Sequence, residues 1–262
     1  MAMNTVMDVI LNRRSVRSYE AKEIDKNTKK EIIKAALRAP TAWWGMMLYS
    51  IIEVSDQSIK DTLAKSCDNQ PFIAKAPWIL LFLADWQRWY DNFNAFGIKE
   101  GCEREKIPMR KPQEGDLLIA CCDALISAQT AVIAAESMGI GSCYIGDIMD
   151  NYEIHRKLFN LPPYVFPICL LCFGYPTKEQ RERKLTPRFN QKFIVFENQY
   201  RRFDREAFED MYRSLHEQTF MGIGTADGAT NFVELNYRNK FNADFAKETN
   251  RSVRAMLKVW NE

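Results

Sequence analysis

The longest apolar stretch of this 262-residue chain, residues 116–138, places the strongest constraint on its fold. It is rich in Ala, Leu and Ile, and Gly139 follows it, at the position where helices commonly end on a glycine. Its length approaches that of a membrane span, but Asp123, Gln129 and Glu136 are unfavourable in hydrocarbon. A helix that is apolar nearly all round in a soluble protein is buried on several sides. The segment therefore predicts a central buried helix, and its small residues predict close packing against a second copy of itself.

Shorter helical and extended patterns alternate around this segment. Capping residues and apolar spacing predict a helix that begins at Thr5, a second that begins after Asp25 or Asn27 and stops before Pro40, and a third over residues 56–66. Apolar runs predict strands over residues 48–54, 77–85 and 167–174, with a further short strand at 193–196. Helical patterns return over residues 203–216 and 237–260. This alternation predicts a layered α/β or α+β domain, and no break in composition divides residues 1–262 into two.

Residues 86–115 are predicted to be polar and irregular. Four aromatic residues, Trp86, Trp89, Tyr90 and Phe93, precede two glycines in this stretch. The pattern fits a mobile flap over a ligand and a surface excursion with aromatic anchors equally well.

The charge balance is nearly neutral. Lys and Arg number 36 against 34 for Asp and Glu, and the net charge of +2 gives no support to nucleic-acid or membrane binding. The N-terminus lacks a basic region followed by an apolar core, so we expect no secretion signal and a cytoplasmic protein.

The seven cysteines do not form a pattern typical of a secreted disulfide framework. Cys169 and Cys172 make a CxxC, but they lie in an unbroken apolar run without a second ligand pair, which favours core packing. Only His155 and His216 are available, without HExxH spacing, so we expect no metal site.

An array of donors, residues 13–18, follows the first predicted helix. Arg13, Arg14 and Arg17 with Ser15 and Ser18 supply three guanidinium groups and two hydroxyls, and no acid lies among them. Guanidinium forks match phosphate oxygens two at a time, so the array suits a phosphate. The alternative is a basic helix end exposed to water.

Five short motifs follow one another over roughly residues 5–200. They are Arg-Arg-Ser-Val-Arg-Ser-Tyr (13–19), Ala-Pro-Thr (39–41), Asn-Gln-Pro-Phe-Ile (69–73), Gly-Ile-Gly-Ser-Cys-Tyr-Ile-Gly (139–146) and Thr-Pro-Arg (186–188). Together they resemble the FMN-dependent nitroreductase family, in its flavin reductase-like, oxygen-insensitive NAD(P)H nitroreductase branch. The resemblance implies an α+β fold with a central, mainly antiparallel sheet flanked by helices. It also implies a homodimer with the long central helix at the interface.

The resemblance implies site residues as well. Arg13, Arg14, Ser15 and Arg17 would surround the FMN phosphate, ribityl chain and pyrimidine edge, and Arg188 would return to the phosphate. Gln70 would hydrogen-bond the flavin or ribityl, Thr41 would belong to the cofactor set, and the backbone at Tyr144, Ile145 and Gly146 would lie against the flavin. Trp43, Trp44 and Met46 would border the substrate. No protein side chain would be catalytic, because the chemistry resides in flavin N5.

The implied activity is hydride transfer from NAD(P)H through flavin N5 to a nitroaromatic, a quinone or free flavin by a ping-pong mechanism. The alternatives are a reductive dehalogenase-like or flavin-fragmenting member of the same fold, and a non-catalytic flavin-binding protein. Family resemblance favours residues 86–115 as a flap bordering the active site. Residues 201–262 would form a helical extension that wraps the partner subunit.

Two segments depart from the family pattern. Where the family tends to carry Ser-Ser-x-Asn-x-Gln, this chain has Thr-Ala-Trp-Trp-Gly-Met at residues 41–46, which removes side-chain donors near the cofactor. Where the family often has Lys-Pro-Arg, this chain has Thr186, which removes a cation. These changes predict weaker FMN binding and a flatter, more aromatic acceptor pocket.

Overall fold

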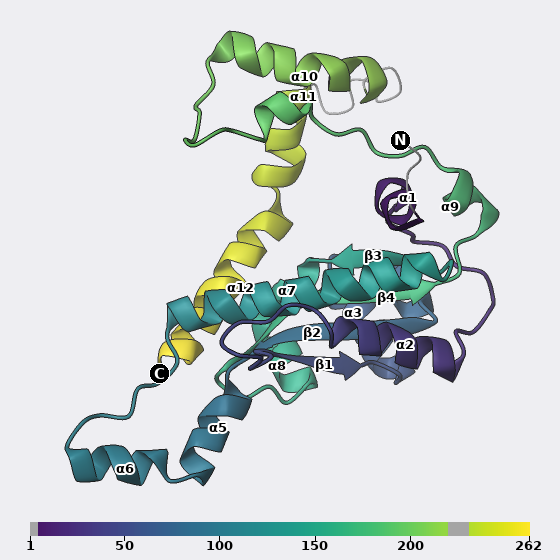
Figure 1. Ribbon diagram of the computed structural model, residues 1–262. Coiled ribbons are helices and arrows are strands. Elements are labelled where there is room, and N and C mark those ends of the chain that lie inside the picture. The colour runs from purple at the N-terminus through teal and green to yellow at the C-terminus, as the bar shows by residue number, and fades with distance from the viewer. Residues whose placement is uncertain (1–4, 220–230) are drawn as a thin grey trace. The chain divides into compact units, whose positions relative to one another are not determined.

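A computed structural model describes residues 5–219 and 231–262 of the chain (Figure 1). It divides into two compact units, the first formed by Met1–Arg183 with Glu248–Glu262 and the second by Lys184–Lys247. Each unit is described by itself.

A four-stranded sheet organises the first unit. Its strands are β1 (Tyr49–Glu53), β2 (Trp78–Asp85), β3 (Gly141–Ile145) and β4 (Val165–Gly174), in the order β1-β2-β4-β3. Every neighbouring pair is antiparallel, and the register shifts between Phe82 and Leu83, opposite Cys169 and Pro167. The strands predicted at residues 48–54, 77–85 and 167–174 are therefore confirmed.

Side-chain alternation along β2 separates two hydrophobic cores. Leu80 and Phe82 enter the core that contains the long helix α7, whereas Leu81 and Leu83 enter the core on the opposite face. All eight residues of β2 are buried, as a strand covered on both faces requires. Cys169 and Cys172 likewise lie in opposite cores, because they are three positions apart along the strand, so the CxxC serves core packing.

Helices cover both faces of the sheet (Figure 1). In the first unit they are α1 (Thr5–Asn12), α2 (Lys26–Ala36), α3 (Gln57–Ser66), α4 (Pro71–Lys75), α5 (Gln87–Ala95), α6 (Ile98–Glu105), α7 (Glu114–Ser137), the 3-10 turn Asp147–Met149, α8 (Tyr152–Leu158), α9 (Lys178–Glu182) and most of α12 (Asp244–Asn261). Asp25 caps α2 by accepting from the N–H groups of Asn27 and Thr28, each at 3.0 Å, as predicted. The helix ends at Ala36, before Pro40.

The long helix α7 packs on the sheet through a stripe of small residues. Ala120, Ala124, Ala128, Ala131 and Ala135 have no exposed surface, and their small side chains let the helix approach the sheet closely. The predicted helix and the terminal Gly139 (φ +74°) are confirmed, but the prediction that the small residues face a second copy was wrong, since most of them face this chain's own sheet. Among the described residues, α7 alone is long and apolar enough to span a membrane.

Two segments differ from the sequence prediction. Residues 86–115 are not irregular, because α5 and α6 form there and the aromatic residues of α5 pack against Trp86 and Tyr164. The strand predicted at residues 193–196 is absent from this described stretch. A 3-10 turn, Gln191–Phe193, stands there, since Phe193 and Phe196 pack on Phe203 with ring centroids 5.6 and 5.8 Å away.

The second unit is helical. It contains α10 (Arg205–Thr219), α11 (Phe232–Asn236), the π-helical turn Tyr237–Phe241 and the first residues of α12. The two predicted C-terminal helices are thus confirmed in kind, with α10 starting at Arg205 and α12 at Asp244. The last part of α12 belongs to the first unit, where Ser252, Met256 and Trp260 are buried against Tyr152 and Tyr164.

The segment after α1 lies along the sheet at two glycines. The Val16 N–H donates to Ser142 O (2.8 Å), and Tyr19 forms a bridge with Pro176. A Cβ on Gly141 would lie 2.5 Å from Val16 Cγ2, and one on Gly174 would lie 2.5 Å from Tyr19 Cδ1. Only glycine permits this close approach, which fixes where residues 13–19 run.

We predict that Gly141→Ala destabilises the fold by about 1–3 kcal/mol, because Val16 must shift to admit the methyl group. The matched control is Gly115→Ala on α7, where a Cβ would meet nothing within 4 Å. Alanine favours helix over glycine by about 1 kcal/mol, so the control is expected to be neutral or stabilising. Denaturant unfolding measures both, and equal stability of the two variants would contradict the packing described.

Candidate functional site

In the arginine segment, residues 13–17, some side chains make contacts within the fold and others do not. The Arg14 guanidinium donates to the carbonyls of Arg181 and Arg183, the second at 2.5 Å, and Val16 is buried. Arg13 and Arg17 form neither an ion pair nor a side-chain hydrogen bond within the described part of the chain. Arg14 therefore serves the fold, while Arg13 and Arg17 keep their guanidinium donors for a ligand.

A late basic segment lies against the arginine segment. Arg183 donates to Ser15 O (2.6 Å), the Arg17 N–H donates to Gln180 Oε1 (3.2 Å), and Arg181 pairs with Glu20 (2.9 Å). No sequence motif indicated this pairing, because about 165 residues of chain separate the two segments. The result is a concentration of guanidinium groups suited to a phosphate dianion.

Gln70 brings a third element to the same region. It precedes α4, and its amide donates to Asp147 Oδ2 (2.8 Å) and Cys67 O (3.0 Å). Asp147 directly follows Gly146, and the Arg17 guanidinium lies 5.9 Å from the Phe72 ring on α4. The structure thus brings together Arg17, Gln70 and the end of β3. Their role in binding a cofactor stays a prediction.

The end of β3 offers accessible backbone. Gly146 is exposed, and a Cβ there would meet nothing within 4 Å, so a planar group can approach the main chain. Ile145 is buried, while the half-buried Tyr144 donates its hydroxyl to Gln129 (3.2 Å). Burial raises the pKa of Tyr144, which keeps the hydroxyl protonated at neutral pH.

Residues 41–48 form a loop anchored on α7. The buried Asp123 carboxylate accepts from the Thr41 hydroxyl (2.5 Å) and from the N–H groups of Ala42 (3.0 Å) and Leu48 (3.1 Å). The Thr41 hydroxyl also accepts from the Met47 N–H (2.9 Å), so the side chain predicted to touch cofactor is engaged in holding this loop.

The same loop presents two tryptophans in left-handed backbone conformations. Trp43 (φ 46°) and Trp44 (φ 57°) directly precede Gly45, and such φ values strain residues with a Cβ. Trp44 is fully exposed, while Trp43 is half exposed and packs edge-on against Trp86 with ring centroids 5.2 Å apart. The half-buried Met46 accepts a hydrogen bond from Trp89 Nε1 through its carbonyl (2.8 Å).

The helix α7 lies between this loop and the arginine segment. Asp123 holds the loop, whereas Glu136, 13 residues further along, accepts from Ser142 (3.3 Å) beside the arginine segment. Thirteen residues of helix span about 20 Å and place the two positions on roughly opposite sides of the axis. Within one chain, the two groups of predicted site residues therefore remain apart.

Arg188 lies in the second unit. It is exposed and donates to the carbonyls of Thr186 (2.8 Å) and Pro187 (3.1 Å). Its predicted return to the cofactor phosphate stays a prediction. No group of three or more His, Cys, Asp or Glu residues in the described ranges could hold a metal ion.

Glu136 was not predicted as part of this region. Burial raises the pKa of its carboxyl to about 7, and the charges of Arg13 and Arg14 and the hydrogen bond from Ser142 oppose that rise. The only sequence signal was an acid near the end of an apolar helix.

With this geometry in place, comparison with known proteins gives the family. A sequence model of the Nitroreductase family matches residues 10–175. A "CR(VI) reductase" of Pseudomonas sp. (strain G-1) is 30% identical over 206 residues, 79% of this chain and 78% of that protein. "FMN reductase (NADPH)" of Bacillus subtilis (strain 168) is 31% identical over 200 residues, 76% and 75% of the two chains. A crystal structure from Bacteroides fragilis NCTC 9343 matches with a TM-score of 0.81 at 26% identity, over 97% of this chain and 98% of that one.

This chain belongs to the Nitroreductase family. The family and the α+β fold with a central antiparallel sheet, both predicted from sequence, are confirmed.

We predict that Glu136→Gln stabilises the protein at alkaline pH and has little effect in acid. The folded-state pKa near 7 exceeds the ordinary value of 4.5, so folding favours the protonated acid. The cost of the carboxylate is absent below pH 4.5, grows as pH rises and is fully present above pH 7. Thermal unfolding at pH 5 and pH 8 measures the difference, with Glu179→Gln at an exposed site on α9 as control. A stabilisation that does not depend on pH would contradict the raised pKa of this partly buried carboxyl.

Proposed function

We propose that this protein transfers a hydride from NAD(P)H to an electron-poor acceptor, such as a nitroaromatic, a quinone or free flavin, by a ping-pong mechanism. It is an NAD(P)H-dependent flavin oxidoreductase with FMN as its cofactor, as its family and its FMN reductase relative support. One observation carries the proposal. Arg13 and Arg17, which form no ion pair with any described residue, lie in the same region as Gln70 and the accessible backbone of Gly146.

The residues present fit a flavin mononucleotide. Arg13, Ser15 and Arg17 would hold the phosphate side, and a dianion among several guanidinium groups loses less on desolvation than an unpaired one. Gln70 and the backbone from Tyr144 to Gly146 would hold the ring. The cluster is built for one mononucleotide phosphate, because residues 139–146 follow a helix and form no dinucleotide fingerprint.

When bound, FMN supplies two-electron chemistry at its N5 atom. The chain therefore needs only to bind, orient and shield the reactants. The raised pKa of Tyr144 keeps that hydroxyl from acting as a base at neutral pH. The two strained tryptophans, Trp43 and Trp44, with Met46, would form the acceptor's aromatic wall.

A homodimer would complete this site. The outward face of α7 exposes Leu118, Cys122, Leu125 and Ile126, and α1 exposes Val6, Met7, Ile10 and Leu11. A two-fold axis pairs such a face with itself. The same axis would bring the loop at residues 41–46 of one copy towards the arginine segment of the other copy. Within one chain these two segments cannot meet, because α7 lies between them. Residues 86–115 would border the site, and the enzyme would act in the cytoplasm. Of the predicted extension, residues 201–262, the part before Glu248 would extend onto the partner, because Glu248–Glu262 belongs to the first unit.

We predict that the purified protein is yellow, releases FMN rather than FAD, and loses its flavin absorbance when NADPH or NADH is added without oxygen. Addition of a nitroaromatic or quinone should restore the colour, since both reactants use one flavin in turn. Mass spectrometry identifies the flavin and anaerobic spectroscopy follows the reaction. Bound FMN that neither nucleotide bleaches would instead identify a flavin-binding protein without this activity.

We predict that Arg13→Ala and Arg17→Ala each weaken FMN binding about tenfold or more, because a charged hydrogen bond contributes about 1.5–3 kcal/mol. Arg38→Ala, at an exposed position outside the cluster, is the matched control. Fluorescence titration of the apoprotein with FMN measures the dissociation constants. Unchanged affinity in both arginine variants would place the phosphate elsewhere.

We predict a dimer in solution that Leu125→Glu disrupts. Leu125 is 42% exposed on the outward face of α7. A two-fold interface would bury the introduced carboxylate of both copies, so the cost of burying an unpaired charge would apply twice. The control is Ile154→Glu, which is 48% exposed on α8. Light scattering at micromolar concentration should give twice 30.5 kDa for wild type and control. A monomeric wild type would refute the interface.

A further inference from the structure

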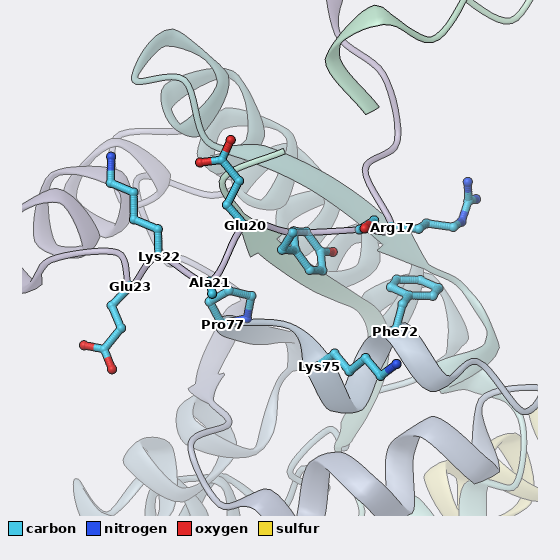
Figure 2. A pocket seen from close by; sticks show the side chains of 10 residues that line it. Arg17, Glu20, Ala21, Lys22, Glu23, Phe72, Lys75 and Pro77 are labelled. Atoms are coloured by element: carbon cyan, nitrogen blue, oxygen red, sulfur yellow. The ribbon is translucent and has the colours of Figure 1, made fainter. Parts of the chain in front are cut away.

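A cavity of about 500 Å³ lies between residues 17–23 and helix α4 (Figure 2). Its volume is that of a small-molecule site. Arg17, Phe72 and Lys75 lie together at one end, whereas Glu20, Lys22 and Glu23 lie at the other. None of the predicted cofactor or substrate residues lines it except Arg17.

The first end of the cavity carries free positive charge. Lys75 and Arg17 form no ion pair and no side-chain hydrogen bond with any described residue. Figure 2 shows Arg17 and Lys75 on either side of Phe72, whose ring centroid lies 5.9 Å from the Arg17 guanidinium. Two unpaired cations on either side of an aromatic ring suit an anionic group attached to a planar ring.

The other end carries acceptors. Glu20 pairs with Arg181 outside the cavity (2.9 Å), and Lys22 lies 3.8 Å from the centre of the Tyr175 ring, so both are partly engaged. The exposed Glu23 remains to accept from hydroxyl or amino groups. Tyr19 and Pro77 also line the cavity.

We propose that this cavity is a second ligand site, beyond the function proposed above, and that it binds a mononucleotide. The phosphate lies between Arg17 and Lys75, the ribose lies beside Phe72, and the base extends towards Glu23, whose carboxylate accepts from an amino group of the base. A dianionic phosphate matches two cations, and the volume admits a base and a ribose. Arg17 borders the cofactor residues as well, and its guanidinium has five donors with which to serve both sides.

The test is calorimetric titration of the FMN-saturated protein with adenosine 5′-monophosphate, adenosine and inorganic phosphate at low ionic strength. We expect saturable binding of the monophosphate at one site per chain, at least tenfold tighter than binding of adenosine or phosphate alone. Flavin absorbance should stay constant throughout. Lys75→Ala should weaken binding about tenfold, Lys75→Arg should retain it, and Lys65→Ala on α3, outside the cavity, should leave it unchanged.

Three outcomes would overturn the proposal. Absence of saturable binding, or equal binding by the Lys75→Ala variant, would show that the cavity does not hold the nucleotide. Equal affinity for inorganic phosphate and the monophosphate would reduce it to a simple anion site. Release of FMN during the titration would show that the nucleotide enters the cofactor site instead. Lys75 is exposed, so its variants should fold, and circular dichroism verifies this.

Discussion

The packing of α7 on the central sheet is the constraint on which the rest of this structure depends. Its alanine stripe lets the helix lie close to the sheet, and that leaves its larger aliphatic residues on the outside. The same helix holds the loop of residues 41–48 through Asp123 and approaches the arginine segment through Glu136. Because these two attachments lie on different sides of one helix, its position separates the two groups of site residues.

Patterns that are local in sequence predicted the local structure well. The continuous apolar run of β2, the Asp25 cap of α2 and the Gly139 end of α7 each depend on neighbouring residues. The strand β3 was missed because its short glycine-containing sequence becomes extended only by pairing with β4. Residues 193–196 resembled a strand by composition, but aromatic packing on Phe203 decided their conformation.

Only part of the candidate site's geometry could be predicted from the sequence. The arginine segment and Gln70 were recognised from motifs, and the structure brings Arg17 and Gln70 into one region. The engagement of Arg14 by the carbonyls of residues 181 and 183 could not be predicted, because about 170 residues of chain separate them. The partly buried carboxyl of Glu136 and the anchoring role of Asp123 likewise require knowledge of which segments meet on α7.

The central claim is that two copies of the chain assemble each complete site, and mixed dimers test it most directly. One copy would carry Arg13→Ala with Arg17→Ala, the other Asp123→Ala to release the loop, and two affinity tags would isolate the mixed species. If the arginine segment of one chain meets the loop of its partner, both lesions fall in one site and the other is intact. The account predicts one tightly bound FMN per mixed dimer and none in either parent. No tight FMN in the mixed dimer would contradict it, because each site would then be built within one chain.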